Sequence, residues 1–130
     1  MSSVRIEILS GAATGRVLEP DSDVVCIGRA DTNDLALPEA HISGEHARLL
    51  IGADDVVLED LRSTNGSAVV RGGERIVLDE ATSLCCSVRS GDRIELGGEG
   101  AESTVLLVHL EQDAEPENVA VVRPIAQFEG

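Results

Sequence analysis

Residues 47–60 read ARLLIGADDVVLED, and this stretch decides the fold class of the chain. Two short runs dominated by Leu, Ile and Val, residues 47–51 and 56–59, flank the turn-forming residues 52–55. Short apolar runs separated by a turn that contains Gly and Asp are typical of two antiparallel strands. The stretch therefore predicts a hairpin whose first strand leaves one end of the domain and whose second strand returns to it.

The same pattern extends in both directions from this hairpin. Short apolar or alternating runs occupy residues 4–9, 16–18, 24–27, 35–37, 68–70, 75–78, 84–88, 93–96 and 105–110, with Gly, Pro, Asp and Ser between them. No window of helical length carries a sustained apolar stripe of helical period; residues 43–50 come nearest, and that window is short. Many short strands joined by turns predict an all-β sandwich or barrel.

The composition excludes several classes of partner. The chain has 130 residues with 24 acidic and 10 basic side chains, a formal net charge of -14, and every basic side chain is Arg. A field of this sign repels nucleic acid and anionic membranes. With one Phe and no Trp or Tyr, the chain also lacks aromatic platforms on which bases stack. We therefore expect an aliphatic core, no nucleic-acid partner and no membrane partner.

Cysteine usage and the N-terminal sequence favour a cytoplasmic protein. Cys26, Cys85 and Cys86 are odd in number and have no CxxC spacing, so a disulfide framework is not expected. The N-terminus lacks the apolar segment of a secretory signal, and no run approaches membrane-spanning length. The Arg-only, Lys-free composition suggests a GC-rich bacterial genome.

The C-terminal end differs in character from the rest of the chain. Residues 1–110 carry the strand pattern and are predicted to form one domain, whereas residues 111–130 read as an acidic linker followed by a short strand-like tail. The tail either docks on its own domain or a neighbouring one, or leads toward further domains. It contains no Ser or Thr, so it cannot supply a phosphothreonine for self-recognition, whereas Thr14 can.

Three polar segments are predicted to meet at one end of the domain: Gly28-Arg29, residues 43–46 (SGEH) and residues 60–67 (DLRSTNGS). Residues 35–37 span only about 10 Å as a strand, too little to cross a sandwich, so residues 29–45 stay at one end. The 47–60 hairpin leaves that end and returns to it. Loops clustered at one end of a rigid sandwich form a typical binding surface.

The side chains of these segments suit a phosphorylated peptide. Arg29 offers a planar fork of donors for phosphate, and Ser43 and Thr64 offer hydroxyl donors. Gly44 exposes a backbone N–H that no side chain screens. Asn65 carries both a donor and an acceptor, which suits contact with an extended peptide backbone. Because the global field opposes an anion, we expect the ligand to be basic around its phosphate.

In this order and spacing, the segments resemble the forkhead-associated (FHA) domain, an eleven-stranded β-sandwich that recognises phosphothreonine. The matching pieces are Gly28-Arg29, Ser43-x-x-His46 and Asp60-Leu61-x-Ser63-Thr64-Asn65-Gly66-Ser67, and residues 90–97 (SGDRIELG) are similar to the family's penultimate strand region. The resemblance covers most of the chain, from residue 4 to residue 110. It implies a two-sheet, SMAD-like sandwich of about eleven short, mostly antiparallel strands.

The resemblance also implies ligand contacts. Arg29, Ser43 and Thr64 would hold the phosphate together with the N–H of Gly44, and Asn65 would hold the peptide backbone. The alternatives are surface exposure for Arg29, loop capping for the two hydroxyls and turn formation for Asn65. The family often has Arg, Lys or Asn at the position of Gly44, so one side-chain contact with phosphate is missing here.

The remaining motif residues are expected to act on the loops or at the rim of the site. Gly28, His46 and Gly66 would shape the loops without touching the ligand. Arg62 is a candidate to compensate for the missing contact and to touch the peptide. His41 is a candidate for contact with a residue beyond the phosphothreonine, with plain surface exposure as the alternative.

Catalytic and metal-binding interpretations lack a scaffold in this sequence. His41 and His46 have no third ligand at a recognisable spacing. No Gly-x-Ser-x-Gly elbow is present, and the absence of Lys removes the phosphate-loop and Schiff-base lysines. The chain is therefore predicted to be a binding module and not an enzyme, with no metal and no cofactor.

These features predict a phosphothreonine-peptide-binding signalling module, a phosphorylation-dependent adaptor whose partner is phosphorylated by a Ser/Thr kinase. It would suit the sensor part of a larger bacterial regulator. The alternative is an FHA scaffold used for phosphate-independent protein assembly, which the acidic charge and Gly44 favour. The oligomeric state is left open.

Overall fold

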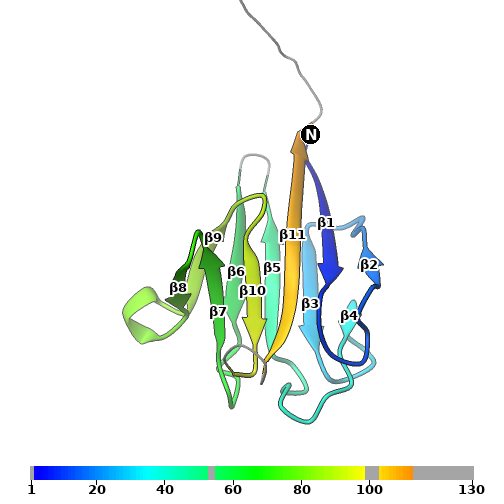
Figure 1. Cartoon of the computed structure of the whole chain (residues 1–130), viewed down its shortest axis with the longest axis vertical. Helices are drawn as coiled ribbons and strands as arrows, with labels where there is room; N and C mark the ends of the chain where they lie inside the picture. The colour runs from blue at the N-terminus through cyan, green and yellow to red at the C-terminus, as the bar shows by residue number, and fades with distance from the viewer. Residues whose placement is uncertain (1, 53–54, 99–102, 113–130) are drawn as a thin grey trace, which may run out of the picture.

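A computed structural model describes residues 2–52, 55–98 and 103–112, which form two facing β-sheets (Figure 1). One sheet has the strand order β2-β1-β11-β10-β7-β8 and contains β1 (Ser2–Ile8), β2 (Val17–Leu18), β7 (Ser67–Arg71), β8 (Glu74–Val77), β10 (Arg93–Leu96) and β11 (Thr104–Gln112). The other has the order β4-β3-β5-β6-β9 and contains β3 (Val24–Gly28), β4 (Leu35–Ala36), β5 (Ala47–Ile51), β6 (Val56–Asp60) and β9 (Cys85–Val88). Among these residues only β3 and β4 pair in parallel.

Each predicted apolar run coincides with one strand, so the predicted two-sheet sandwich of mostly antiparallel strands is confirmed. The 47–60 hairpin is β5 and β6. The sequence pattern did not indicate the short 3-10 helix η1 (Glu80–Thr82), whose first N–H groups are capped by the side chain of Asp79. A single turn is too short to carry a periodic apolar stripe.

The core between the sheets is aliphatic throughout the described residues. Alternate strand positions point inward, so Leu49 of β5, Leu58 of β6, Ile94 of β10 and Leu106 of β11 have no exposed surface. Burial of each such side chain contributes roughly 1.5–3 kcal/mol. The sandwich that carries the loops is therefore held together by Leu, Ile and Val side chains from both sheets.

Strand pairing brings the three polar segments to one end of the sandwich. β3 ends beside the start of β5, because Ile27 lies opposite Ala47, and β6 ends there too, because Ala47 lies opposite Asp60. β4 has only two residues, so the chain between β3 and β5 does not cross the sandwich. This arrangement is the one that the short run at residues 35–37 predicts.

An ion pair between half-buried Arg71 and buried Asp92 holds the opposite end together. Arg71, the last residue of β7, donates from Nη2 to Oδ2 of Asp92 at 2.7 Å and to the carbonyl of Ser87 in β9 at 2.9 Å. Burial of the Asp92 carboxyl disfavours its ionisation, yet the Arg71 hydrogen bond and the Arg89 N–H hold its pKa below the ordinary value. Since β7 and β9 belong to different sheets, this contact joins the two sheets far from the polar loops.

The end of the chain is only partly covered. β11 extends through Gln112, two residues into the predicted linker, and residues 113–130 with the predicted tail lie outside the described residues. The three cysteines are free thiols. Within the described ranges, no helix has the length and apolar character needed to cross a membrane.

Candidate functional site

The first two polar segments are joined through their backbones. The N–H of Arg29 donates to the carbonyl of Ser43 at 2.9 Å, and the N–H of Ala30 donates to the carbonyl of Gly44 at 3.2 Å. A Cβ atom at Gly28 would lie 2.2 Å from the Gly44 carbonyl oxygen. Glycine at position 28 is therefore required for the close approach that places Arg29 beside Ser43.

His46 joins the second segment to the third. Its side chain is fully buried; Nδ1 accepts a hydrogen bond from the Ser43 N–H at 3.0 Å, and Nε2 lies 2.8 Å from the carbonyl of Gly66. Because an N–H only donates and a carbonyl only accepts, the imidazole is neutral with its proton on Nε2. Burial lowers the pKa of His46, which favours this neutral form.

Asp60 holds the third segment in place through hydrogen bonds with Ser63 and Ser67. Its buried carboxylate accepts hydrogen bonds from the Ser63 N–H at 2.8 Å, the Ser63 hydroxyl at 2.6 Å and the Ser67 hydroxyl at 2.5 Å. The Ser63 oxygen in turn accepts from the N–H of Gly66, which has a φ of 86°. The sequence motif contains Asp60 without revealing this role; the Asp-x-x-Ser spacing, which suits a side-chain-capped turn, is the signal that indicates it.

The predicted phosphate-binding side chains lie on these connected loops. The N–H of Thr64 donates to Oγ of Ser43 at 3.0 Å, so these two residues are direct neighbours. Arg29 and Thr64 are exposed and Ser43 is half-buried. Within the described residues, neither the guanidinium of Arg29 nor the hydroxyl of Thr64 has a hydrogen-bond or ion-pair partner.

Gly44 and Asn65 occupy the rim. A Cβ atom at Gly44 would meet no atom within 4 Å, so open space lies beside its backbone. The Asn65 side chain is exposed and donates from Nδ2 to the carbonyl of His41 at 3.0 Å. Since that carbonyl can only accept, the amide orientation is determined, and Oδ1 is the atom left to accept from a ligand.

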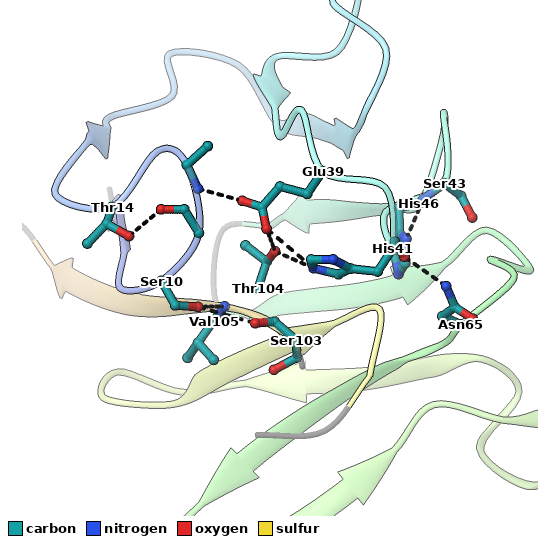
Figure 2. A network of polar contacts seen from close by, with 12 residues as sticks. Ser10, Thr14, Glu39, His41, Ser43, His46, Asn65, Ser103, Thr104 and Val105 are labelled. Carbon is teal, nitrogen blue, oxygen red and sulfur yellow. Dashed lines mark hydrogen bonds and ion pairs between the residues drawn. The ribbon is translucent and has the colours of Figure 1, made fainter. Parts of the chain in front are cut away.

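The other two candidates differ in their surroundings. Arg62 has a φ of 59° and forms an exposed ion pair with Glu80 at 3.3 Å. His41 is half-buried, and its Nε2 lies 2.7 Å from Oγ1 of Thr104 (Figure 2). The alternative of a plainly exposed His41 is therefore wrong, because its side chain is only 29% exposed and its ring contacts Thr104.

Stability is expected to fall as the pH drops below about 6.5 because of His46. The folded state keeps this imidazole neutral with a lowered pKa, whereas in the unfolded chain it titrates near 6.5. As the pH falls, the unfolded state therefore binds a proton that the folded state does not bind, and the free energy of unfolding decreases. Urea unfolding of wild type and His46→Gln at about pH 7.5 and about pH 5.5 measures this contribution as the difference between their pH slopes. An NMR titration in which the His46 ring protonates at or above 6.5 would contradict the assignment.

Comparisons with known proteins place this geometry in one family. The FHA domain model matches residues 25–97. FhaB of Mycobacterium tuberculosis strain H37Rv, an FHA domain-containing protein, is 39% identical over 64 residues, which is 49% of this chain and 41% of FhaB. The match therefore spans less than half of that relative.

Solved structures agree in fold. The FHA domain of an Arabidopsis thaliana hypothetical protein has a TM-score of 0.72 and 26% identity, covering 90% of this chain and 92% of that one. The FhaA FHA domain, crystallised in complex with the intracellular domain of Rv3910, has a TM-score of 0.63 and 25% identity, covering 82% of this chain and 100% of that one.

The family match spans more than half of the chain and includes all three polar segments. FHA domains are non-catalytic modules that generally bind phosphothreonine peptides. By its motifs, its sandwich fold and this match, the chain belongs to the FHA domain family.

Proposed function

We propose that this chain acts as a phosphorylation-dependent adaptor, which binds a partner protein through a phosphothreonine held by Arg29, Ser43 and Thr64. The N–H of Gly44 assists at the phosphate, and Asn65 holds the peptide backbone. The observation that carries the proposal is the guanidinium of Arg29, which is exposed, has no partner in the part of the chain that the structure describes, and lies on a loop bonded to the one that carries Ser43. Within the three polar segments the other cation, Arg62, is already paired with Glu80.

The two hydroxyls are ready to donate. Ser43 Oγ already accepts from the Thr64 N–H, so its own hydrogen is directed elsewhere. The Thr64 hydroxyl has no partner within the described residues. A phosphate presents acceptors only, so a fork of Arg donors beside two O–H donors complements it.

The affinity of such a site is modest and reversible. Hydrogen bonds to a charged group contribute about 1.5–3 kcal/mol each. Two or three of them, reduced by the cost of ordering a flexible peptide, support a modest affinity. Reversible binding of this strength suits a partner whose phosphorylation by a Ser/Thr kinase is transient.

Charge limits the class of partner. The formal net charge of -14 opposes an anionic ligand. Exposed Asp31 lies two residues beyond Arg29, and exposed Glu45 follows Gly44. We infer that the bound phosphothreonine is flanked by basic residues, whose attraction to these carboxylates offsets the repulsion of the phosphate.

The relatives support a role within bacterial signalling assemblies. The match covers 41% of mycobacterial FhaB, which is consistent with one module of a larger regulator. The FhaA domain was crystallised with an intracellular domain of another protein. The competing function, a scaffold that assembles proteins without phosphate, is separated from the proposal by the Arg29 experiment.

Arg29→Ala is expected to weaken binding of a phosphothreonine peptide by about 100-fold or more, because it removes a bidentate contact with the dianion. Isothermal titration with phosphothreonine, phosphoserine and unmodified versions of one peptide library measures the effect. The phosphoserine version is expected to bind about 10–200-fold more weakly, through loss of one methyl contact.

Arg93→Ala is the matched control for Arg29→Ala. Arg93 is also exposed, but it lies at the start of β10, at the end of the sandwich away from the loops. Equal binding of phosphorylated and unmodified peptides, or equal loss in both variants, would reject phosphothreonine recognition and leave the phosphate-independent scaffold.

Gly44→Arg is expected to strengthen phosphopeptide binding by about 3- to 10-fold, through a second guanidinium near the phosphate. The position accepts a side chain, because a Cβ atom there meets nothing within 4 Å. Gly44→Ala separates the charge from the backbone effect and is expected to bind as wild type does. If Gly44→Arg weakens binding while Gly44→Ala does not, the phosphate lies elsewhere.

Peptides with Arg on both sides of the phosphothreonine are expected to bind about 10-fold more tightly than peptides with Glu there, at an ionic strength of about 0.05 M. The difference is expected to shrink at about 0.5 M salt because exposed charges are screened. Fluorescence anisotropy across this salt range measures it. Glu45→Gln is expected to reduce the preference and Glu74→Gln, exposed on β8, to leave it unchanged; a preference for Glu-flanked peptides would refute the inference.

A further inference from the structure

Glu39 connects segments that are far apart in the sequence (Figure 2). Its Oε2 accepts a hydrogen bond from the backbone N–H of Ala12 at 2.8 Å, and its Oε1 accepts one from the Thr104 hydroxyl at 2.9 Å. The side chain of Glu39 is only 14% exposed. A mostly buried carboxylate with two directed donors is a fixed anchor between the β1–β2 loop and the start of β11.

The Thr104 hydroxyl extends this anchor to His41. Its single hydrogen is donated to Glu39, so the oxygen can only accept from the imidazole, whose Nε2 lies 2.7 Å away. The His41 ring therefore carries a proton on Nε2. Thr104 has no exposed surface, so water does not compete for these bonds.

The backbone of His41 reaches the proposed peptide site. Its carbonyl accepts the hydrogen bond from Nδ2 of Asn65 at 3.0 Å. The Ile42 N–H donates to the carbonyl of Glu39 at 3.0 Å and closes a turn over residues 39–42, which leads directly into Ser43. In Figure 2 the polar contacts run from Glu39 through Thr104 and His41 to Asn65.

Two glycines leave this network little room to move. A Cβ atom at Gly97 would lie 2.6 Å from the His41 carbonyl oxygen, so the backbone after β10 presses against that carbonyl. A Cβ atom at Gly11 would collide with the carboxylate of Glu39 in the same way. The turn is thus held at its side chains by hydrogen bonds and at its backbone by close packing.

We propose that Glu39 is a positioning residue for peptide recognition: through the Thr104 hydroxyl and the His41 ring it holds the carbonyl that orients the Asn65 amide. This inference rests on the proposed function. With Nδ2 held by His41, Oδ1 of Asn65 is pre-set to accept an N–H from the bound peptide, and less ordering is required on binding. The same turn sets the position of Ser43.

Thr104→Val and Thr104→Ser form a matched pair that tests the network. Valine keeps the β-branched shape and removes the hydroxyl, whereas serine keeps the hydroxyl and removes the methyl group. Thr104→Val is expected to weaken binding of a phosphothreonine peptide by about 3- to 10-fold, and Thr104→Ser to bind as wild type does. Thermal unfolding of each variant shows that it is folded under the binding conditions.

Glu39→Gln tests the anchor itself. The amide keeps the size of the side chain but cannot accept from both Ala12 and Thr104, so weaker binding is expected, again by about 3- to 10-fold. Loss of a negative charge alone would strengthen binding of a phosphate. Weaker binding by Glu39→Gln would therefore reflect the loss of positioning and not the change in electrostatic field. Glu74→Gln, which removes the same charge from an exposed site, is the control.

A second readout follows the Asn65 side-chain amide protons by NMR without any peptide, with Asn65→Ala used to assign their signals. Thr104→Val and Glu39→Gln are expected to shift or broaden these signals, and Thr104→Ser and Glu74→Gln to leave them in place. A folded Thr104→Val variant with wild-type affinity, or Thr104→Ser weaker than Thr104→Val, would overturn the inference. If the wild type binds no phosphopeptide, the proposed function fails; unchanged Asn65 signals would then overturn the coupling as well.

Discussion

A neutral, buried imidazole sets the distance between the two loops that carry the proposed recognition residues. His46 accepts from the N–H of Ser43 and donates to the carbonyl of Gly66, so one small ring satisfies a donor and an acceptor on loops from different parts of the chain. Both partners are main-chain groups, so these two hydrogen bonds do not depend on the side chains at positions 43 and 66. A charged ring would lose its bond to Ser43, because a protonated Nδ1 cannot accept. Both loop-bridging hydrogen bonds therefore form only when the His46 imidazole is neutral with its proton on Nε2.

Hydrogen bonds between and within the motif loops satisfy many of their polar groups. Asp60 takes the hydroxyls of Ser63 and Ser67, and Ser43 takes the N–H of Thr64. Among the residues that the structure describes, the guanidinium of Arg29 and the Thr64 hydroxyl have no partner, and no contact uses the hydrogen of the Ser43 hydroxyl. In the proposed site these hydrogen bonds fix the loop backbones before a ligand arrives, so less ordering is required on binding.

Local and global charge oppose each other in this molecule. The chain as a whole is strongly acidic, yet the three motif segments contain only one exposed carboxylate, Glu45, and Arg29, which pairs with no other described residue. Under the proposed function, short-range, charge-assisted hydrogen bonds would decide whether a phosphate binds, whereas the long-range field would decide which flanking residues are tolerated. Selectivity for a partner would then come as much from the surface around the loops as from the proposed phosphate contacts.

The strand pattern by itself determined the all-β class and the positions of the strands, because alternation and turn residues are local properties. It also determined that the motif loops meet at one end, because the run at residues 35–37 is too short to cross the sandwich and the 47–60 hairpin returns to its starting end. The motif residues, including Arg29, Ser43 and Thr64, could likewise be identified from the sequence, since the motif is defined by residue type and spacing. Only the tertiary structure showed which side chains support these motif residues. The link from Glu39 through Thr104 to His41, and the burial of Asp92 against Arg71, join residues brought together by strand pairing and packing, and a hydrogen bond across 65 positions leaves no periodic signal in the sequence.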